Sequence, residues 1–360
     1  MAAVDWITEA DGVFRGGGVK GLALAGALCG FADHPTKRIT AWKNVAGASA
    51  GAIIACYLAT GHSAEDMLKL MKETKFSSFA DFPAHSKLLG ITRLPLRHGM
   101  ASGQAFESWF DEVLEGTTFG PLRKPSSNGD APQWSLKLIA VDVTKRRLLV
   151  LPDDLVFYRE PGRSSLIDPD TFKVARAARM SMSIPYFFDP MRLEDQDGTA
   201  CTIVDGGTLS NFPVWLFDVD PSVTGKPPVR PTFGFTLMHG RGLGGGLGTL
   251  QKLQPWGIHF AFDIFHTAQE AWDTRFVSHS TRVRTVTVDA GDVATTEFNL
   301  SPERQEMLIS NGRAAAQTFL DQFELSDYMN TFHAPLAPEG TGGNGRDATT
   351  PAAATAGRSM

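Results

Sequence analysis

The sequence predicts a three-layer α/β/α fold, in which helices cover both faces of a mostly parallel central sheet. Three observations support this. The N-terminal part alternates short apolar runs of strand length with small-residue runs of helix length, which is typical of parallel sheets. Glycine-rich or small-residue turns stand where the predicted strands pass into helices. The 360 residues are 42 % hydrophobic and 20 % charged, so a large globular core is expected.

The composition argues against several classes of protein. The net charge is -5 with no clustered basic excess, so no nucleic-acid partner is expected. Cys29, Cys56 and Cys201 each lie in an apolar run, which predicts buried free thiols and not a disulfide framework. The chain shows neither a secretory signal nor an apolar run of roughly 18 residues. We therefore expect a cytoplasmic protein, with export without a cleaved signal left open.

The N-terminal half is expected to alternate strands and helices. The predicted elements are strands at 11–15 and 42–46 and helices at 22–31, 50–60 and 104–114. Ser63, with Asp66 three residues later, has the spacing of a capping box and predicts the start of another helix. Residues 75–103, rich in Phe, Pro, Gly and His, are expected to form a loop or cap insertion.

The C-terminal half has more predicted strands. The expected elements are strands at 135–143, 147–152, 201–204, 230–238 and 285–289 and helices at 171–180, 257–276 and 302–323. Ser301 suits an N-cap and Pro302 a first turn. The expected division of the chain is an N-terminal extension at 1–10, a core at 11–217, its C-terminal continuation at 218–330 and a disordered tail at 334–360.

The segment Gly47-Ala48-Ser49-Ala50-Gly51 matches the pattern GxSxG. A serine on a tight strand-to-helix turn needs small neighbours, because the backbone there is strained and crowded. Gly47 and Gly51 provide that room. The following helix presents free N–H groups and a partial positive charge near Ser49. Ser49 is therefore a candidate nucleophile, although the pentapeptide alone equally fits a small-residue helix start packed against a sheet.

The segment Gly16-Gly17-Gly18-Val19-Lys20-Gly21 fits GxGxxG. A dinucleotide site would require an acidic residue at the end of the second strand, where the sequence has Val45-Ala46-Gly47. The spacing of a phosphate-binding P-loop is also absent. Consecutive glycines let several backbone N–H groups converge on one developing negative charge. We interpret the segment as an oxyanion loop; a tight turn required by strand–helix packing is the alternative.

The segment Asp205-Gly206-Gly207 directly follows the strand expected at 201–204. An aspartate in this place is exposed to the approach of another backbone or a substrate, because two glycines follow it. Asp205 is therefore a candidate acceptor for the Ser49 proton. The alternative is an aspartate that caps a turn, which is common for Asp-Gly.

Together and in this order, the three segments resemble those of the patatin-like phospholipases, a family of lipid acyl hydrolases. Ala175–Pro185 and Asn211-Phe212-Pro213 are similar to the family's segments that flank the acid. The resemblance covers about 11–217, is looser to about 325 and is absent in the tail. Arg15 departs from the small or acidic residue that related sequences often have before the glycines.

The resemblance implies a Ser–Asp dyad. Ser49 would attack the ester carbonyl, Asp205 would act as the general base, and the amides of Gly16, Gly17 and Gly18 would hold the oxyanion. Lys20 would orient the loop or an anionic head group. Because aspartate is a weak base with an ordinary pKa near 3.9, we expect Asp205 to be partly buried, with a raised pKa, within hydrogen-bond reach of Ser49.

The resemblance also implies a phospholipid or other acyl lipid as substrate and identifies no protein activator; peripheral contact with a membrane is left open. The sequence has no HExxH, no paired cysteines and no Asp-rich calcium loop, so we expect no metal and no cofactor. The mixed basic and apolar segment 85–98 is either a docking surface for an anionic bilayer or an ordinary cap loop. One alternative function is an esterase with a Ser49, Asp205 and His239 triad. Another is a non-catalytic lipid-binding module on the same fold. The dyad predicts that no histidine contacts the Ser49 hydroxyl.

Overall fold

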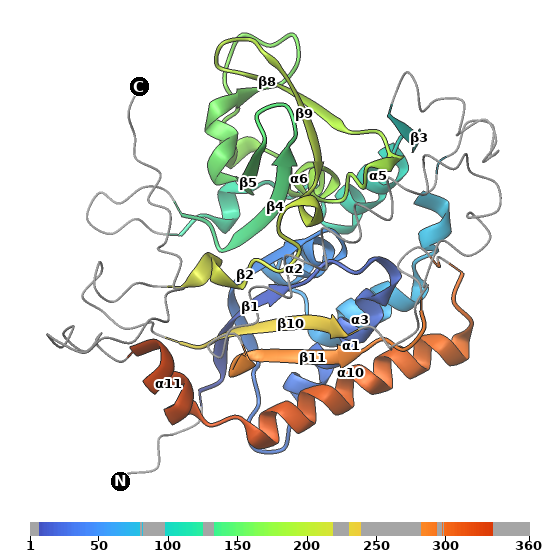
Figure 1. Ribbon diagram of the computed structural model, residues 1–360, viewed down its shortest axis with the longest axis vertical. Coiled ribbons are helices and arrows are strands. Elements are labelled where there is room, and N and C mark those ends of the chain that lie inside the picture. Colours follow the sequence, from blue (N-terminus) through green and yellow to red (C-terminus); the bar gives the residue numbers. More distant parts are fainter. Residues whose placement is uncertain are drawn as a thin grey trace, which may run out of the picture.

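The computed structural model describes residues 7–79, 81, 98–124, 133–218, 230–238, 282–293, 297 and 299–333. Its central feature is a nine-stranded sheet with the order β11-β10-β1-β2-β4-β9-β8-β6, in which β5 also pairs with β4 (Figure 1). The strands of this sheet are β1 Glu9–Phe14, β2 Ala41–Ala48, β4 Leu136–Asp142, β5 Arg147–Leu151, β6 Tyr158–Arg159, β8 Met191–Asp195, β9 Ala200–Asp205, β10 Thr232–Met238 and β11 Thr285–Asp289. A separate parallel pair joins β3 Gly99–Ala101 to β7 Tyr186–Phe188.

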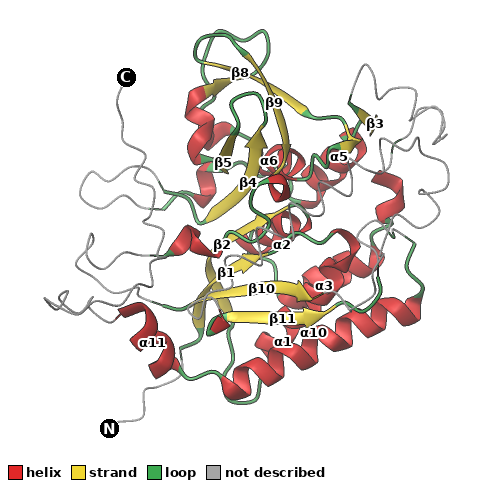
Figure 2. Ribbon diagram, viewed as in Figure 1, coloured by secondary structure: helices red, strands yellow, loops and turns green. Residues whose placement is uncertain are grey.

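The helices flank this sheet, as Figure 2 shows in red around the yellow strands. They are α1 Gly21–Asp33, α2 Ala50–Ala59, α3 Ala64–Glu73, α5 Gln104–Val113, α6 Val174–Ser181, α10 Pro302–Gln322 and α11 Leu325–His333. Side chains of α1, α2, α3 and α10 share one core with Phe14 and Phe235 of the sheet. On the opposite face, Val13 and Ala46 pack against Val214, which opens a short 3-10 helix. The three-layer α/β/α prediction is therefore confirmed.

The sheet has two halves that meet at β4. From β11 to β4 all neighbouring strands are parallel, whereas β5, β9, β8 and β6 pair antiparallel. The parallel half is the part that the strand–helix alternation predicts. Its strands β1, β2 and β10 end at the same edge, because they run in the same direction. In parallel sheets this is the edge where ligands bind.

Two small-residue contacts hold α1 against α10. A Cβ atom on Gly26 would lie 2.4 Å from the Ile309 carbonyl oxygen, and one on Gly312 would lie 2.0 Å from the Ala23 carbonyl oxygen. Larger residues at these positions would force the two helix backbones apart. The close pair packs against the sheet, since α1 contacts β10 and β11 and α10 contacts β11.

Most predicted elements are present, with ends that shift by a few residues. The capping box at Ser63 and Asp66 is confirmed, and so are the three buried free thiols. Strands β3, β6, β7 and β8 and helix α11 were not predicted. Strand β3 corrects the expectation of a loop or cap insertion at 75–103, because its Met100 and Ala101 are buried in the core. The predicted helix at 257–276, the glycine-rich stretch 240–248, most of the segment 85–98 and the tail 334–360 lie outside the described residues. Within the described ranges, no helix combines the length and apolarity needed to cross a membrane.

Candidate active site

Ser49 occupies a strained turn between β2 and α2. Its backbone has φ 53° and ψ -127°, a conformation that residues with a side chain rarely adopt and that costs roughly 1–3 kcal/mol. A Cβ on Gly47 would lie 2.2 Å from the Gly51 carbonyl oxygen, and one on Gly51 would lie 2.2 Å from the Phe14 carbonyl oxygen. Both glycines are thus required by the turn. The sharp strand-to-helix turn has the geometry expected of an activated serine.

Asp205 is brought to this turn by the register of the sheet. Ala48, the residue before Ser49, is level with Ile139 on β4, and the next residue, Ala140, is level with Asp205 on β9. Asp205 therefore ends its strand across β4 from Ser49. A Cβ on Gly206 would lie 2.2 Å from the Ile139 carbonyl oxygen, so the chain passes this close to β4 only because residue 206 is glycine.

The environment of Asp205 favours its protonated form. The side chain is fully buried, and burial raises the pKa of Asp205 to about 7, while hydrogen bonding from the Gly207 N–H and the Ser49 hydroxyl opposes this rise. Oδ1 accepts the Gly207 N–H at 2.7 Å. Oδ2 is buried and makes no bond of standard geometry to another described residue. The Ser49 hydroxyl is thus near enough to lower the pKa of Asp205, but it makes no hydrogen bond of standard geometry to Oδ2.

The glycine-rich loop lies beside Ser49. A Cβ on Gly16 would lie 2.9 Å from the Ser49 Cβ and 2.2 Å from Asn211 Oδ1. The Gly16 N–H donates to the Asn211 carbonyl at 3.2 Å, and Asn211 Nδ2 donates back to the Gly16 carbonyl at 3.3 Å. The Gly16 amide is therefore engaged in fixing the loop, which revises the expectation of three available oxyanion donors.

Gly17 and Gly18 follow Gly16 in the same loop. Gly17 has Leu237 Cδ1 only 2.3 Å from the place of a Cβ, and Gly18 has φ 56°, so neither position suits a side chain. Their amides precede a 3-10 turn over Gly18–Lys20 and bond to no other residue in the described ranges. Lys20 is buried, which favours a role in orienting the loop over direct contact with a head group.

A narrow apolar pocket opens at Ser49. Its volume is about 30 Å³, roughly the share of one water molecule in the liquid. Apolar side chains from six segments line it: Val19, Ile53, Met71, Phe79, Met182 and Phe188. Such a lining suits a hydrocarbon chain, and an acyl chain of more than a few carbons would have to displace some of these side chains.

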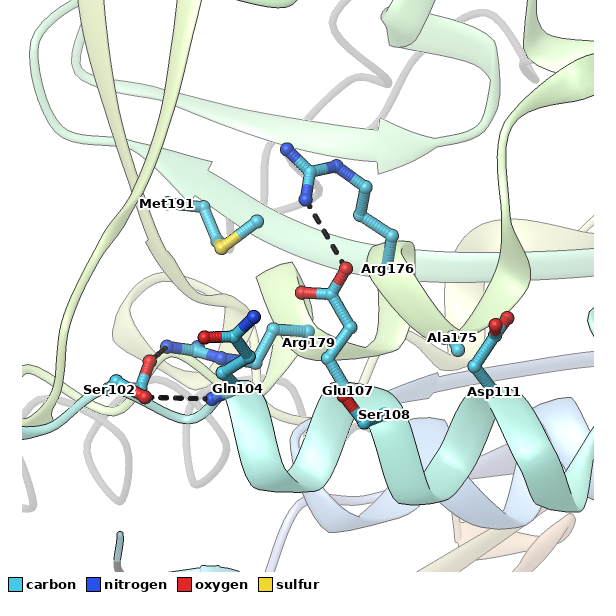
Figure 3. Close-up of a pocket in the computed structure, with 9 residues that line it drawn as sticks. All are labelled: Ser102, Gln104, Glu107, Ser108, Asp111, Ala175, Arg176, Arg179 and Met191. Carbon is cyan, nitrogen blue, oxygen red and sulfur yellow. Dashed lines mark hydrogen bonds and ion pairs between the residues drawn. The ribbon is translucent and has the colours of Figure 1, made fainter. Parts of the chain in front are cut away.

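A second, polar pocket of about 330 Å³ lies between α5 and α6 (Figure 3). Arg176 crosses it and pairs with Glu107 at 3.2 Å and with Glu160 at 2.7 Å. Its charged lining is thus internally neutralised, and neither Ser49 nor Asp205 reaches it.

The histidines of the described part lie elsewhere. His34 bonds with Asp321 at 3.2 Å, and His62 stacks on Tyr57. His239, the candidate third member of a triad, lies outside the described residues.

The sequence analysis named the segments around Ser181, Ser183 and Asn211 but gave these residues no role. In the structure the Ser181 hydroxyl accepts the Ser49 N–H, and the Ser183 carbonyl accepts the Asp205 N–H. The Asn211 side chain donates to the Gly16 carbonyl.

Comparison with known proteins places the chain. A family model described as patatin-like phospholipase matches residues 12–218. Uncharacterized protein YqhO of Bacillus subtilis (strain 168) is 36 % identical over 323 residues, which cover 87 % of this chain and 98 % of YqhO. Uncharacterized protein R571 of Acanthamoeba polyphaga mimivirus is 27 % identical over 206 residues, covering 57 % of this chain and 60 % of R571.

Solved structures show weaker similarity. VipD from Legionella pneumophila aligns with a TM-score of 0.46 at 15 % identity, over 88 % of this chain and 67 % of VipD. ExoU in its complex with SpcU from Pseudomonas aeruginosa aligns with a TM-score of 0.45 at 17 % identity, over 92 % of this chain. The chain spans about half, 53 %, of the matched ExoU structure. From the family model, which covers more than half of the chain, the chain belongs to the patatin-like phospholipase family of lipid acyl hydrolases.

Proposed function

We propose that this protein hydrolyses acyl esters of phospholipids or related lipids through a Ser49–Asp205 dyad, with the amides of Gly17 and Gly18 as the oxyanion hole. The observation that carries the proposal is a buried carboxylate with a pKa near 7 beside a serine on a strained turn. A carboxylate of ordinary pKa would be too weak a base, whereas one near the working pH both ionises and accepts a proton.

In the acylation step, Ser49 Oγ attacks the ester carbonyl and its proton passes to Asp205. The carbonyl oxygen becomes an anion, which the Gly17 and Gly18 N–H groups stabilise. The intermediate then collapses, the ester C–O bond breaks, and the leaving alkoxide takes the proton from Asp205. Each oxyanion donor is expected to contribute about 10²–10³ in rate.

In the deacylation step, Asp205 accepts a proton from water as the water attacks the acyl-serine. The second oxyanion uses the same two amides. Its collapse breaks the bond to Ser49 Oγ, which recovers the proton from Asp205, and the fatty acid leaves. The apolar pocket beside Ser49 supports an acyl group as the part of the substrate that binds there.

The proposal is tested by hydrolysis of p-nitrophenyl butyrate and of phospholipid vesicles. Ser49→Ala is expected to lose at least about 10⁴-fold in kcat, and His239→Ala is expected to stay near wild type. The kcat/KM of the wild type should rise with pH through about 7, because protonated Asp205 cannot accept a proton. Equal loss in His239→Ala and Ser49→Ala would establish a triad, and vesicle binding without any hydrolysis would establish a lipid-binding module.

A further inference from the structure

The turn at the C-terminal end of α6 holds the backbone of both proposed dyad residues. Ser181 Oγ accepts the Ser49 N–H at 3.1 Å and donates to the Ile139 carbonyl at 2.6 Å. Two residues later, the Ser183 carbonyl accepts the Asp205 N–H at 2.9 Å. Ser181, Ser183 and Asp205 have no exposed surface, so water does not compete for these bonds.

The Ser181 contact matters because of the conformation of Ser49. Ser49 stands between β2 and α2 with φ 53°, and its buried amide N–H needs an acceptor. Within the described residues, its acceptor is the Ser181 hydroxyl. A strained conformation persists only where its surroundings determine it. The hydroxyl is suited to this, because it accepts from Ser49 and donates to β4 at the same time.

Arg179 anchors this turn from the side away from Ser49. Its Nη1 donates to Ser183 Oγ at 2.6 Å, and its Nη2 donates to the carbonyls of Ser102 and Asp189, each at 2.7 Å. Figure 3 shows Arg179 reaching from α6 toward Ser102 at the wall of the polar pocket. The turn is thus fixed at both ends, since Arg179 ties it to the loop before α5 and Ser181 ties it to β4.

We propose that Ser181 is a positioning residue, which holds the Ser49 turn so that the hydroxyl faces Asp205. The inference rests on the proposed function, because it assigns the geometry of that same dyad. Ser181 touches neither the substrate nor a transferred proton. It acts through the Ser49 backbone. The same turn also contains Ser183, whose carbonyl holds the Asp205 N–H, so one turn sets the distance between nucleophile and base.

The test compares Ser181→Ala and Ser181→Cys with Ser135→Ala. Ser135 is a matched control, because its hydroxyl donates to the Leu122 carbonyl at 3.2 Å just before β4, at the end of the strand far from the dyad. In both Ser181 variants, kcat for p-nitrophenyl butyrate is expected to fall about 10–100-fold with KM within about twofold. The control should keep wild-type kcat. Thermal melting is measured for all three variants.

Two results would overturn the inference. One is a kcat of the Ala variant within about twofold of the wild type. The other is a wild-type kcat in Ser181→Cys, which keeps the side-chain volume but is a poor hydrogen-bonding group, and so would show that only packing matters. If kcat of Ser181→Ala is unchanged but its KM is raised, Ser181 contributes to substrate binding and the inference is wrong as well.

A second readout does not require activity. Hydrogen–deuterium exchange of the peptide that contains Ser49 should be faster in Ser181→Ala than in the wild type and Ser135→Ala. If no protein hydrolyses any ester but this exchange pattern holds, the proposed function fails and the positioning contact stands. If the wild type is active and exchange is unchanged in Ser181→Ala, the positioning inference fails alone.

Discussion

The two halves of the sheet contribute different parts of the site. The parallel half supplies Ser49 and the glycine-rich loop at the ends of β2 and β1, where backbone crowding excludes side chains. The antiparallel half supplies Asp205 at the end of β9, where burial perturbs a charge. In the parallel half, close backbone contacts determine the site, and in the antiparallel half, burial of a carboxylate does. Strand β4 lies between the two halves and pairs with both. Changes in the two halves should therefore have different signatures in activity and stability.

After the loss expected for Ser49→Ala, the largest expected effect tests the antiparallel half. Asp205→Asn keeps an oxygen for the Gly207 N–H but removes the base, so kcat/KM is expected to fall about 10³–10⁴-fold, the upper end of what general-base catalysis contributes. Asp195→Asn is the control, because Asp195 lies on neighbouring β8 and pairs with Lys145. Steady-state kinetics at pH 8 measure both variants. An active Asp205→Asn enzyme would remove Asp205 from the mechanism.

The same substitution is expected to stabilise the folded protein at high pH. The folded pKa of Asp205, about 7, exceeds its unfolded value near 3.9, so the folded state binds more protons between these values. Ionised Asp205 therefore lowers the free energy of unfolding as pH rises from about 4 to 7, by at most about 4 kcal/mol.

Urea denaturation measures this difference. Asp205→Asn should be more stable than the wild type at pH 8, and the two should converge below about pH 4. Equal stability at pH 8 would mean that Asp205 has no raised pKa, and that the antiparallel half is not specialised by desolvation.

A backbone clash tests the parallel half. Gly47→Ala would bring a Cβ to 2.2 Å from the Gly51 carbonyl oxygen, and we expect a loss of about 1–3 kcal/mol or more in the free energy of unfolding, together with loss of activity. Gly116→Ala, whose Cβ would meet nothing within 4 Å but whose φ is 69°, should lose about 1 kcal/mol from backbone strain alone. Equal urea midpoints would contradict the crowding argument.

The smallest expected effect concerns two arginines on α6. Arg179 is buried and donates to several carbonyls, and burial lowers its pKa to about 10. Arg179→Lys should destabilise by about 2 kcal/mol, because buried acceptors lose their partners. Arg176→Lys, at a more exposed pair with Glu107 and Glu160, should cost under about 1 kcal/mol. The reverse order in urea denaturation would show that Arg179 does not anchor the turn.

Local rules made much of the parallel half predictable. Gly47 and Gly51 are required by contacts within the turn and with the adjoining strand, so the pentapeptide carries the information for its own geometry. The capping box at Ser63 is equally local. The antiparallel half is harder to predict, because its strands β6 and β8 are short. In β8 the sequence Met-Arg-Leu-Glu-Asp has only two apolar residues, too few to establish an alternating pattern.

Tertiary contacts made parts of the site unpredictable. The Gly16 amide is engaged by Asn211, 195 residues later, and no pattern near Gly16 indicates this. Ser181 lies 132 residues from Ser49. The segment around Ser181 resembles a family motif, but the motif does not give the role of the hydroxyl. That role depends on β2 and β4 lying side by side, so that Ser181 can bond to Ser49 and to Ile139.

One backbone oxygen links the two halves in a way that matters for engineering. The Ile139 carbonyl accepts a hydrogen bond from the Ser181 hydroxyl and lies against Gly206, so it adjoins both the residue that bonds to Ser49 and the residue that follows Asp205. A repacking of β4 that moves this oxygen would displace both groups together. Redesign of the active site for a new ester should therefore leave β4 untouched and vary the side chains around the apolar pocket, where a change in shape need not disturb the alignment of the reacting groups.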